Sequence, residues 1–337
     1  MPLTADNTTH PYDSLTPDVI LDAVETYGVH CTGELLPLNS YENRVYRVGT
    51  EEQGPVAVKF YRPGRWSDDA ILEEHAFTLM LEQHEIPVVA PVRDADGRSL
   101  NRFSGFRFSL FPWQPGRVPE LNRPEDFAIV GRYLGRLHAL GKTEPFQHRP
   151  TLTIEAYGID AVAYIREHDF MPAHLETAYD SLTAQLLGMI SDRFAATRIA
   201  NIRLHGDCHL SNLLWTDTGP HIVDFDDCRM GPAVQDLWML LAGEREEQEQ
   251  QLANVLVGYT QFCDFSTAQL GLIESLRTLR MLHYSAWLAQ RWDDPAFPFA
   301  FPWFNTTRYW EEHILSLREQ QAALAEPPLE FHRELAG

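Results

Sequence analysis

One short polar run limits both the folds and the functions open to this chain. The run HGDCHLSN, residues 205–212, places Asp207 and Asn212 five residues apart, and Asp224 follows twelve residues later at the end of an apolar segment. Amide and carboxylate oxygens of this kind suit Mg²⁺ with bound phosphates, and a further carboxylate beside them can accept a hydroxyl proton. The pattern predicts a site for magnesium-dependent phosphoryl transfer, whose nucleophile comes from the substrate.

A pair of strands is predicted much earlier in the chain. Pro55–Tyr61 (PVAVKFY) clusters β-branched and aromatic residues around Lys59, and Asn43–Val48 has the same character. Glu51–Gly54 supplies turn residues between the two runs. Together these features indicate an antiparallel pair with a lysine on its second strand.

A helix is expected directly after that pair. Ser67 is a suitable N-cap, apolar residues follow at helical spacing, and Pro87 requires the helix to end before it. The helix carries two neighbouring acids, Glu73 and Glu74. An acid on the element after a lysine-bearing strand can pair with that lysine.

The chain is long enough for two domains. Its 337 residues are about twice a typical domain. A predicted strand over 106–111 is broken by two prolines and a glycine in Pro112–Arg117, so we expect a domain over 1–112 and a second over 113–337. Helices are expected over 17–27, 124–140, 154–168, 174–193, 248–261, 267–291 and 307–325, and short strands over 202–205, 212–215 and 221–224.

Charge and composition exclude several classes of protein. Lys and Arg number 27 against 48 for Asp and Glu, a formal charge of −21, so nucleic acid and anionic membranes are not expected as partners. There is no apolar run long enough for a signal peptide or a membrane span. The four cysteines show no C-x-x-C spacing, which favours reduced thiols in the cytoplasm.

The motif H-x-D-x-x-x-x-N followed by a strand-terminal Asp resembles that of the aminoglycoside phosphotransferase and choline kinase branch of the protein-kinase-like superfamily. Other runs, among them Leu38–Tyr46, Val58–Pro63 and Gly231–Trp238, are similar to the bacterial stress-response kinases of that branch, and the similarity extends over essentially the whole chain. The resemblance implies an α+β, two-lobed fold with an antiparallel-sheet N-terminal lobe that binds nucleotide. It also implies a larger, mainly helical C-terminal lobe for catalysis and substrate.

The resemblance implies a role for each residue of the polar run. Asp207 matches the catalytic aspartate that orients and deprotonates the attacking hydroxyl, and Asn212 and Asp224 match the metal-binding pair. His205 is expected to brace this loop. Asp236 resembles a buried aspartate that hydrogen-bonds the loop, which is a structural role.

Nucleotide-binding residues follow from the same resemblance. Lys59 matches the lysine that contacts the α- and β-phosphates, and Glu74 matches its acidic partner, with Glu73 as the alternative. Ser40 lies in the turn that closes over the phosphates, where SYEN replaces the glycine-rich motif of protein kinases. We therefore expect contact through the Ser40 hydroxyl and nearby backbone N–H groups. Asp226 stands where protein kinases have glycine, so no phosphorylated activation loop is expected.

The function implied is ATP- and Mg²⁺-dependent phosphorylation of serine or threonine hydroxyls on proteins, by a cytoplasmic and monomeric enzyme active in a stress response. Two alternatives remain open from the sequence: a kinase for an amino alcohol, sugar or aminoglycoside, and an inactive ATP-binding regulatory module. The same machinery serves small alcohols in this fold, so motif spacing does not separate protein from small-molecule acceptors.

Other residues near the motif have alternative interpretations. His205, His209, Cys208 and Cys228 could form a soft zinc site, and the two cysteines could be redox-responsive instead of packed. The aromatic residues between Trp287 and Phe304 could line an acceptor pocket or pack a long loop. Each interpretation predicts a different arrangement of side chains.

Overall fold

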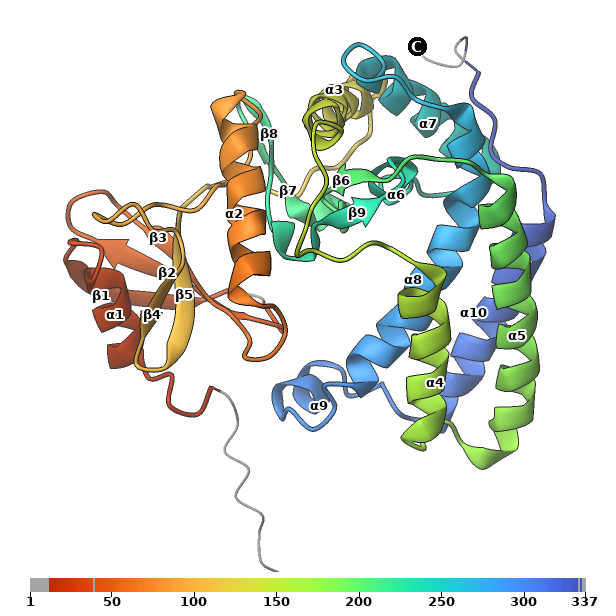
Figure 1. Ribbon diagram of the computed structural model, residues 1–337, viewed down its shortest axis with the longest axis horizontal. Helices are drawn as coiled ribbons and strands as arrows, with labels where there is room; N and C mark the ends of the chain where they lie inside the picture. Colours follow the sequence, from red (N-terminus) through yellow and green to blue (C-terminus); the bar gives the residue numbers. More distant parts are fainter. Residues whose placement is uncertain (1–11, 39, 333, 335–337) are drawn as a thin grey trace, which may run out of the picture. The chain divides into compact units, whose positions relative to one another are not determined.

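The computed structural model describes residues 12–38, 40–332 and 334 and divides the chain into two compact units, Met1–Pro115 and Gly116–Gly337 (Figure 1). Unit 1 contains a five-stranded antiparallel sheet of order β1-β2-β3-β5-β4. Its strands are β1 (Cys31–Pro37), β2 (Arg44–Thr50), β3 (Val56–Phe60), β4 (Asn101–Phe103) and β5 (Phe106–Pro112).

Two helices accompany this sheet. In α1 (Pro17–Glu25), Ile20 belongs to one apolar cluster with Val58 and Phe60 of β3. Lys59 lies between these two residues on β3, and its side chain points to the opposite face because strand side chains alternate. That face meets α2 (Asp68–Gln83) through Glu74. The sheet therefore keeps its apolar core on the α1 side and directs its lysine toward α2.

Unit 2 is mainly helical. Its α-helices are α3 (Pro124–Gly141), α4 (Asp160–Glu167), α5 (Ala173–Ala196), α6 (Val234–Trp238), α7 (Arg245–Tyr259), α8 (Ile273–Ala289), α9 (Ala296–Ala300) and α10 (Thr307–Ala325). Two small antiparallel ladders interrupt them: β6 (Ile202–Leu204) with β9 (Arg229–Gly231), and β7 (Leu213–Thr216) with β8 (Gly219–Ile222). Among the described residues, no helix combines the length and apolar composition needed to cross a membrane.

Glycines set the close packing of α3 against α7. A Cβ atom added to Gly131 would lie 2.0 Å from the Val255 carbonyl oxygen, and one added to Gly258 would lie 2.0 Å from the Ala128 carbonyl oxygen. Only glycine allows backbones to approach this closely. The α3–α7 pair forms a rigid support for the loop after β6, because α3 also carries the buried His138 that reaches Asp236.

The long helices lie where the periodicity of the sequence predicts them, and the predicted strand pair is present as β2 and β3. Helix starts agree with the expected caps: the Ser67 hydroxyl accepts a hydrogen bond from the Ala70 N–H. Two expected helices begin differently: the one over 154–168 with a π-helix, Glu155–Ile159, and the one over 267–291 with a 3-10 helix, Thr267–Leu272. The strands β1, β4 and β9 and the short helices α6 and α9 were not predicted.

Candidate active site

The loop that follows β6 is held by one buried carboxylate. Asp236, fully buried on α6, accepts hydrogen bonds from the backbone N–H groups of His205 and Gly206, both at 2.8 Å. Its Oδ2 atom also lies 3.0 Å from Nε2 of His138. Gln235 donates to the Gly206 carbonyl at 3.1 Å. The expected structural role of Asp236 is confirmed by these bonds.

His205 joins two neighbouring loops. Its Nε2 atom lies 2.8 Å from the Val223 carbonyl oxygen, and its Nδ1 atom lies 3.3 Å from the Asp207 backbone nitrogen. The ring packs against Phe225, with centroids 4.6 Å apart. Because both ring nitrogens are engaged, His205 braces the loop as predicted.

The segments that carry Asn212 and Asp224 are joined by a backbone hydrogen bond. The Val223 N–H donates to the Asn212 carbonyl at 3.0 Å, and Asp224 is the next residue, exposed and left-handed with φ 61°. The Asn212 side-chain amide donates to the Asp207 carbonyl at 3.0 Å. Hydrogen bonds therefore link the loop of Asp207 and Asn212 to the segment that carries Asp224.

The Asp207 carboxylate is held by two basic side chains. Its Oδ1 atom accepts a hydrogen bond from Nη1 of Arg280 at 2.5 Å, and its Oδ2 atom lies 3.4 Å from Nε2 of His209. Burial by itself raises the pKa of this carboxyl group. The hydrogen bond from His209 and the charge of Arg280 outweigh burial and hold the pKa of Asp207 well below its usual range. The carboxylate is therefore ionised at neutral pH.

Unit 1 contains the predicted nucleotide-binding residues. Nζ of Lys59 lies 3.7 Å from Oε1 of Glu74, and both side chains are buried. The ammonium group also lies 5.3 Å from the centre of the Tyr61 ring. The Ser40 hydroxyl donates to the Asn43 carbonyl at 3.1 Å, so it fixes its own turn. Lys59 and Glu74 thus form a buried ion pair within unit 1.

The soft-metal interpretation has little support. Cys208 and Cys228 are fully buried, and burial raises the pKa of the Cys208 thiol well above its usual value, which disfavours the thiolate. Among the described residues, no three His, Cys, Asp or Glu side chains are gathered as a metal cluster. These observations favour packed, unreactive cysteines in this loop.

The aromatic run near the C-terminus is mostly a packed cluster. The Trp287 ring lies 5.1 Å from Phe297 and 6.0 Å from Phe301, and Phe297 is fully buried. Phe299 and Trp303 differ, with 90% and 45% exposure. The loop thus packs on its own rings and exposes two of them.

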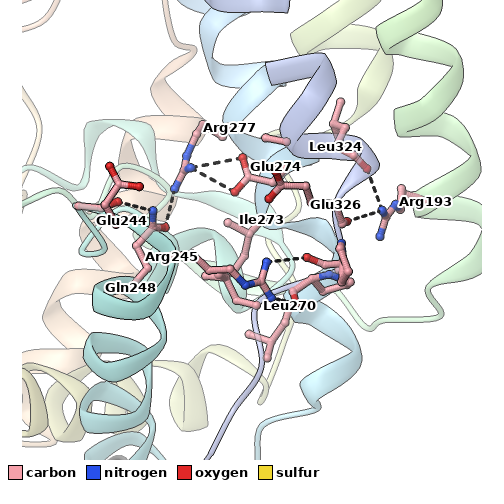
Figure 2. A pocket seen from close by; sticks show the side chains of 16 residues that line it. Arg193, Glu244, Arg245, Gln248, Leu270, Ile273, Glu274, Arg277, Leu324 and Glu326 are labelled. Atoms are coloured by element: carbon pink, nitrogen blue, oxygen red, sulfur yellow. Dashed lines mark hydrogen bonds and ion pairs between the residues drawn. The ribbon is translucent and has the colours of Figure 1, made fainter. Parts of the chain in front are cut away.

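A cavity of about 210 Å³ in unit 2 is separate from these residues (Figure 2). Its arginines already bond neighbouring groups: Arg245 donates to the carbonyls of Pro327 and Pro328, and Arg277 pairs with Glu274 at 3.1 Å. None of the residues predicted for the site lines it. Its bonded arginines hold the C-terminal segment in place.

The sequence did not indicate Arg280 or Gln235 as part of this site. Arg280 lies 73 residues after Asp207, on α8, and no motif links the two positions. Gln235 lies beside the predicted Asp236, so proximity to that residue is the only signal that could have found it.

Comparison with known proteins agrees with this geometry. Residues 34–273 match the model of the phosphotransferase enzyme family. The chain is 44% identical over 325 residues to stress response kinase A of Escherichia coli K12, covering 96% of this chain and 98% of that one. It is 43% identical over 320 residues to serine/threonine protein kinase RdoA of Salmonella typhimurium, covering 95% and 97%.

Solved structures of low sequence identity share the fold. An amicoumacin kinase superimposes with a TM-score of 0.73 at 20% identity, covering 95% of this chain and 97% of that one. A microcompartment-associated aminopropanol kinase gives a TM-score of 0.68 at 19% identity, covering 91% and 96%. The expected kinase-like fold is confirmed. The chain therefore belongs to the phosphotransferase enzyme family and is a homologue of stress response kinase A.

Proposed function

We propose that this protein transfers the γ-phosphoryl group of ATP to serine or threonine hydroxyls of proteins, with Mg²⁺, in the cytoplasm and as a monomer. The observation that carries the proposal is the hydrogen bonding that links the loop of Asp207 and Asn212 to the segment of Asp224, in a chain 44% identical to stress response kinase A over 96% of its length.

Asp207 is the proposed base. The hydroxyl oxygen of the acceptor attacks the γ-phosphorus, the bond from that phosphorus to the bridging oxygen of ADP breaks, and the hydroxyl proton passes to the Asp207 carboxylate. Its low pKa keeps the group ionised and able to orient the hydroxyl. Asp236 and His205 act as positioning residues because they fix the loop and not the reacting atoms.

Asn212 and Asp224 fit a hard divalent cation. The Asn212 side-chain nitrogen is turned to the Asp207 carbonyl, which leaves its oxygen as the atom for a metal, and Asp224 offers a neighbouring exposed carboxylate. An amide oxygen and a carboxylate are ligands that Mg²⁺ accepts together with phosphate oxygens and water. When bound, Mg²⁺ supplies charge neutralisation at the phosphates.

Unit 1 is the proposed nucleotide-binding lobe and unit 2 the proposed catalytic lobe. The ion pair with Glu74 restrains Lys59, so that its ammonium group can contact the α- and β-phosphates without a large loss of side-chain entropy. The turn that contains Ser40 is proposed to close over the phosphates through backbone N–H groups and the serine hydroxyl.

The proposal is tested by incubating the full chain with γ-labelled ATP and Mg²⁺, together with a protein extract and a panel of amino alcohols, sugars and aminoglycosides. We expect label on phosphoserine and phosphothreonine in proteins, and about 10²–10⁴-fold slower labelling in a matched reaction with Asp207→Asn. Label confined to small molecules would reject the protein acceptor.

A further inference from the structure

The carboxylate of Asp207, the proposed base, is hydrogen-bonded to an arginine. Arg280 Nη1 lies 2.5 Å from Asp207 Oδ1, and His209 lies 3.4 Å from Oδ2. A carboxylate that accepts a hydroxyl proton needs one oxygen within hydrogen-bond distance of that hydroxyl. The arginine bond is the shorter of the two and fills one acceptor position of Oδ1, so a hydroxyl that approaches from that side reaches the atom when Arg280 takes another partner.

Arg280 is able to change partners. Its side chain is 40% exposed, and within the described residues it forms no other hydrogen bond or ion pair. Ion pairs that reach solvent are weak, because water stabilises both charges when they separate. A competing anion beside Asp207 can therefore exchange with this carboxylate for the guanidinium.

The guanidinium group also defines which anion competes well. Arginine binds carboxylates and phosphates through two parallel N–H groups, a geometry that a single hydroxyl or amine cannot match. A cationic acceptor cannot bind the guanidinium and would leave the ion pair with Asp207 intact. The net charge of −21 does not reverse this local preference, since exposed charges beyond about 8 Å are largely screened at physiological salt.

Side chains along α8 extend this surface. Tyr284 and Trp287 follow Arg280 at positions i+4 and i+7, so all three share one face of the helix. The two rings stack at 5.7 Å, and the Arg291 guanidinium lies 5.3 Å from the centre of the Trp287 ring. The strip from Arg280 to Arg291 is about 16 Å long at the helical rise, the span of about five residues of extended peptide.

A half-buried ring pair supports the same part of α8. Tyr157, in the π-helix, stacks on His283 with centroids 4.2 Å apart, and the Arg229 guanidinium lies 5.1 Å from the centre of the Tyr157 ring. Arg229 is itself bound to Asp227 at 2.7 Å. The backbone that carries Arg280 is thus held firmly, while the Arg280 side chain can change partners.

We propose that Arg280 is a specificity-determining residue, which binds an acidic side chain next to the serine or threonine that is phosphorylated. The acidic group takes the guanidinium from Asp207, and the Oδ1 atom then accepts the hydrogen bond of the hydroxyl. This inference rests on the proposed protein kinase activity and names the substrate class of that site: peptides with aspartate, glutamate or a phosphorylated residue adjacent to the acceptor.

The test uses three peptides that differ at one position, with Asp, Asn or Lys beside a single serine. For the full chain with ATP and Mg²⁺, we expect kcat/KM for the Asp peptide to exceed that for the Asn peptide by about 10- to 100-fold, the value of one charge-assisted hydrogen bond. The Lys peptide should be the poorest substrate. In Arg280→Gln the Asp-to-Asn ratio should fall below about 3, since a neutral amide gains little from the charge.

Arg277→Gln is the matched control. Arg277 lies one turn earlier on α8 but is bonded to Glu274 and Gln248 in the cavity of Figure 2, so the wild-type ratio should remain. Arg280→Lys keeps the charge and loses the paired N–H geometry, so it should retain the order of the peptides with a smaller ratio. Arg280→Glu should favour the Lys peptide.

The outcomes separate this inference from the function on which it rests. The role of Arg280 is overturned if peptides are phosphorylated with the same Asp-to-Asn ratio of kcat/KM in wild type and Arg280→Gln, or if the wild type prefers the Lys peptide. Either result leaves the protein kinase activity standing. Transfer of label to amino alcohols but to no peptide overturns both.

Discussion

The Oδ1 atom of Asp236 accepts a hydrogen bond from the backbone nitrogen of Gly206 at 2.8 Å, out of contact with solvent. Gly206 has φ +87°, and a Cβ atom there would lie 2.3 Å from the Asp227 carbonyl oxygen. The position of Asp207, the next residue, therefore depends on two features: a glycine at 206 and the buried carboxylate of Asp236 as its acceptor. The position of Asp207 is set by groups that never contact substrate.

Replacing Asp236 by asparagine should move that loop. One carboxylate oxygen becomes an NH₂ group facing backbone N–H donors or His138, and a buried donor left without an acceptor costs about 1–3 kcal/mol of unfolding free energy. A shift of about 1 Å in the loop lowers kcat roughly 10²-fold, with little change in the KM for ATP. Urea unfolding and steady-state kinetics measure the two effects. Unchanged kcat in a destabilised variant would limit Asp236 to folding.

Asp207→Asn should separate binding from chemistry. The amide keeps the size of the side chain but cannot take the hydroxyl proton, so turnover should fall by about 10²–10⁴-fold, the range for a positioned general base. Nucleotide affinity, measured by calorimetry with ADP and Mg²⁺, should remain. A variant that keeps the wild-type rate would show that another group is the base.

Asp224→Ala should weaken the part of nucleotide binding that depends on Mg²⁺. Loss of groups that merely orient metal ligands costs 10- to 100-fold in metal affinity, so loss of a ligand should raise the apparent Kd for Mg²⁺ at least about 10-fold. The measurement is Mg²⁺ titration of nucleotide binding, with a chelator as reference. Asp217→Ala, in the exposed turn between β7 and β8, is the matched control and should leave the titration unchanged.

The sequence was most informative where local chemistry decides the structure. The cap at Ser67 and the periodicity of the following helix predicted α2, and the motif indicated two segments, of Asp207 with Asn212 and of Asp224, that hydrogen bonds link in the structure. It failed at β1, where the strand is mostly exposed and its register shifts between Cys31 and Leu35, so there is no alternation to detect. β4 has three residues, too few for any period.

Arg280 shows a different limit. Its contact with Asp207 joins positions 73 residues apart, and it depends on how α8 packs against the loop after β6. A lone arginine on a long helix is ordinary in a sequence, because most such side chains extend into solvent. Only the tertiary structure distinguishes this arginine from Arg277, one turn earlier.

The buried ion pair in unit 1 gives a stability prediction. Glu74→Gln leaves Lys59 buried beside a neutral group, and removing one partner of a buried pair costs about 3–5 kcal/mol. Glu73→Gln changes the neighbouring, half-buried acid and should cost less. Urea unfolding followed in unit 1, together with the KM for ATP, compares the two. Equal losses would indicate that Glu73 shares the pairing with Lys59.

The stability of unit 2 should decrease in mild acid, and one buried histidine on α10 contributes to this loss. His313 stacks on Tyr309 with ring centroids 5.8 Å apart, and its Nε2 atom lies 3.4 Å from the Ser285 hydroxyl. Burial lowers the pKa of His313 to about 4. The unfolded chain, with a histidine pKa of about 6.5, therefore binds more protons than the folded protein between those two values.

Stability then rises with pH across that window and falls as pH is lowered. From pH 7 to pH 5, His313 should remove about 2 kcal/mol of unfolding free energy, since each unit of pKa difference is worth about 1.4 kcal/mol. In His313→Gln this contribution is absent, so the difference in unfolding free energy between pH 7 and pH 5 should shrink by about that amount. Urea unfolding of both proteins at pH 7 and pH 5 measures the change, and an equal acid loss in the variant would assign it to other groups.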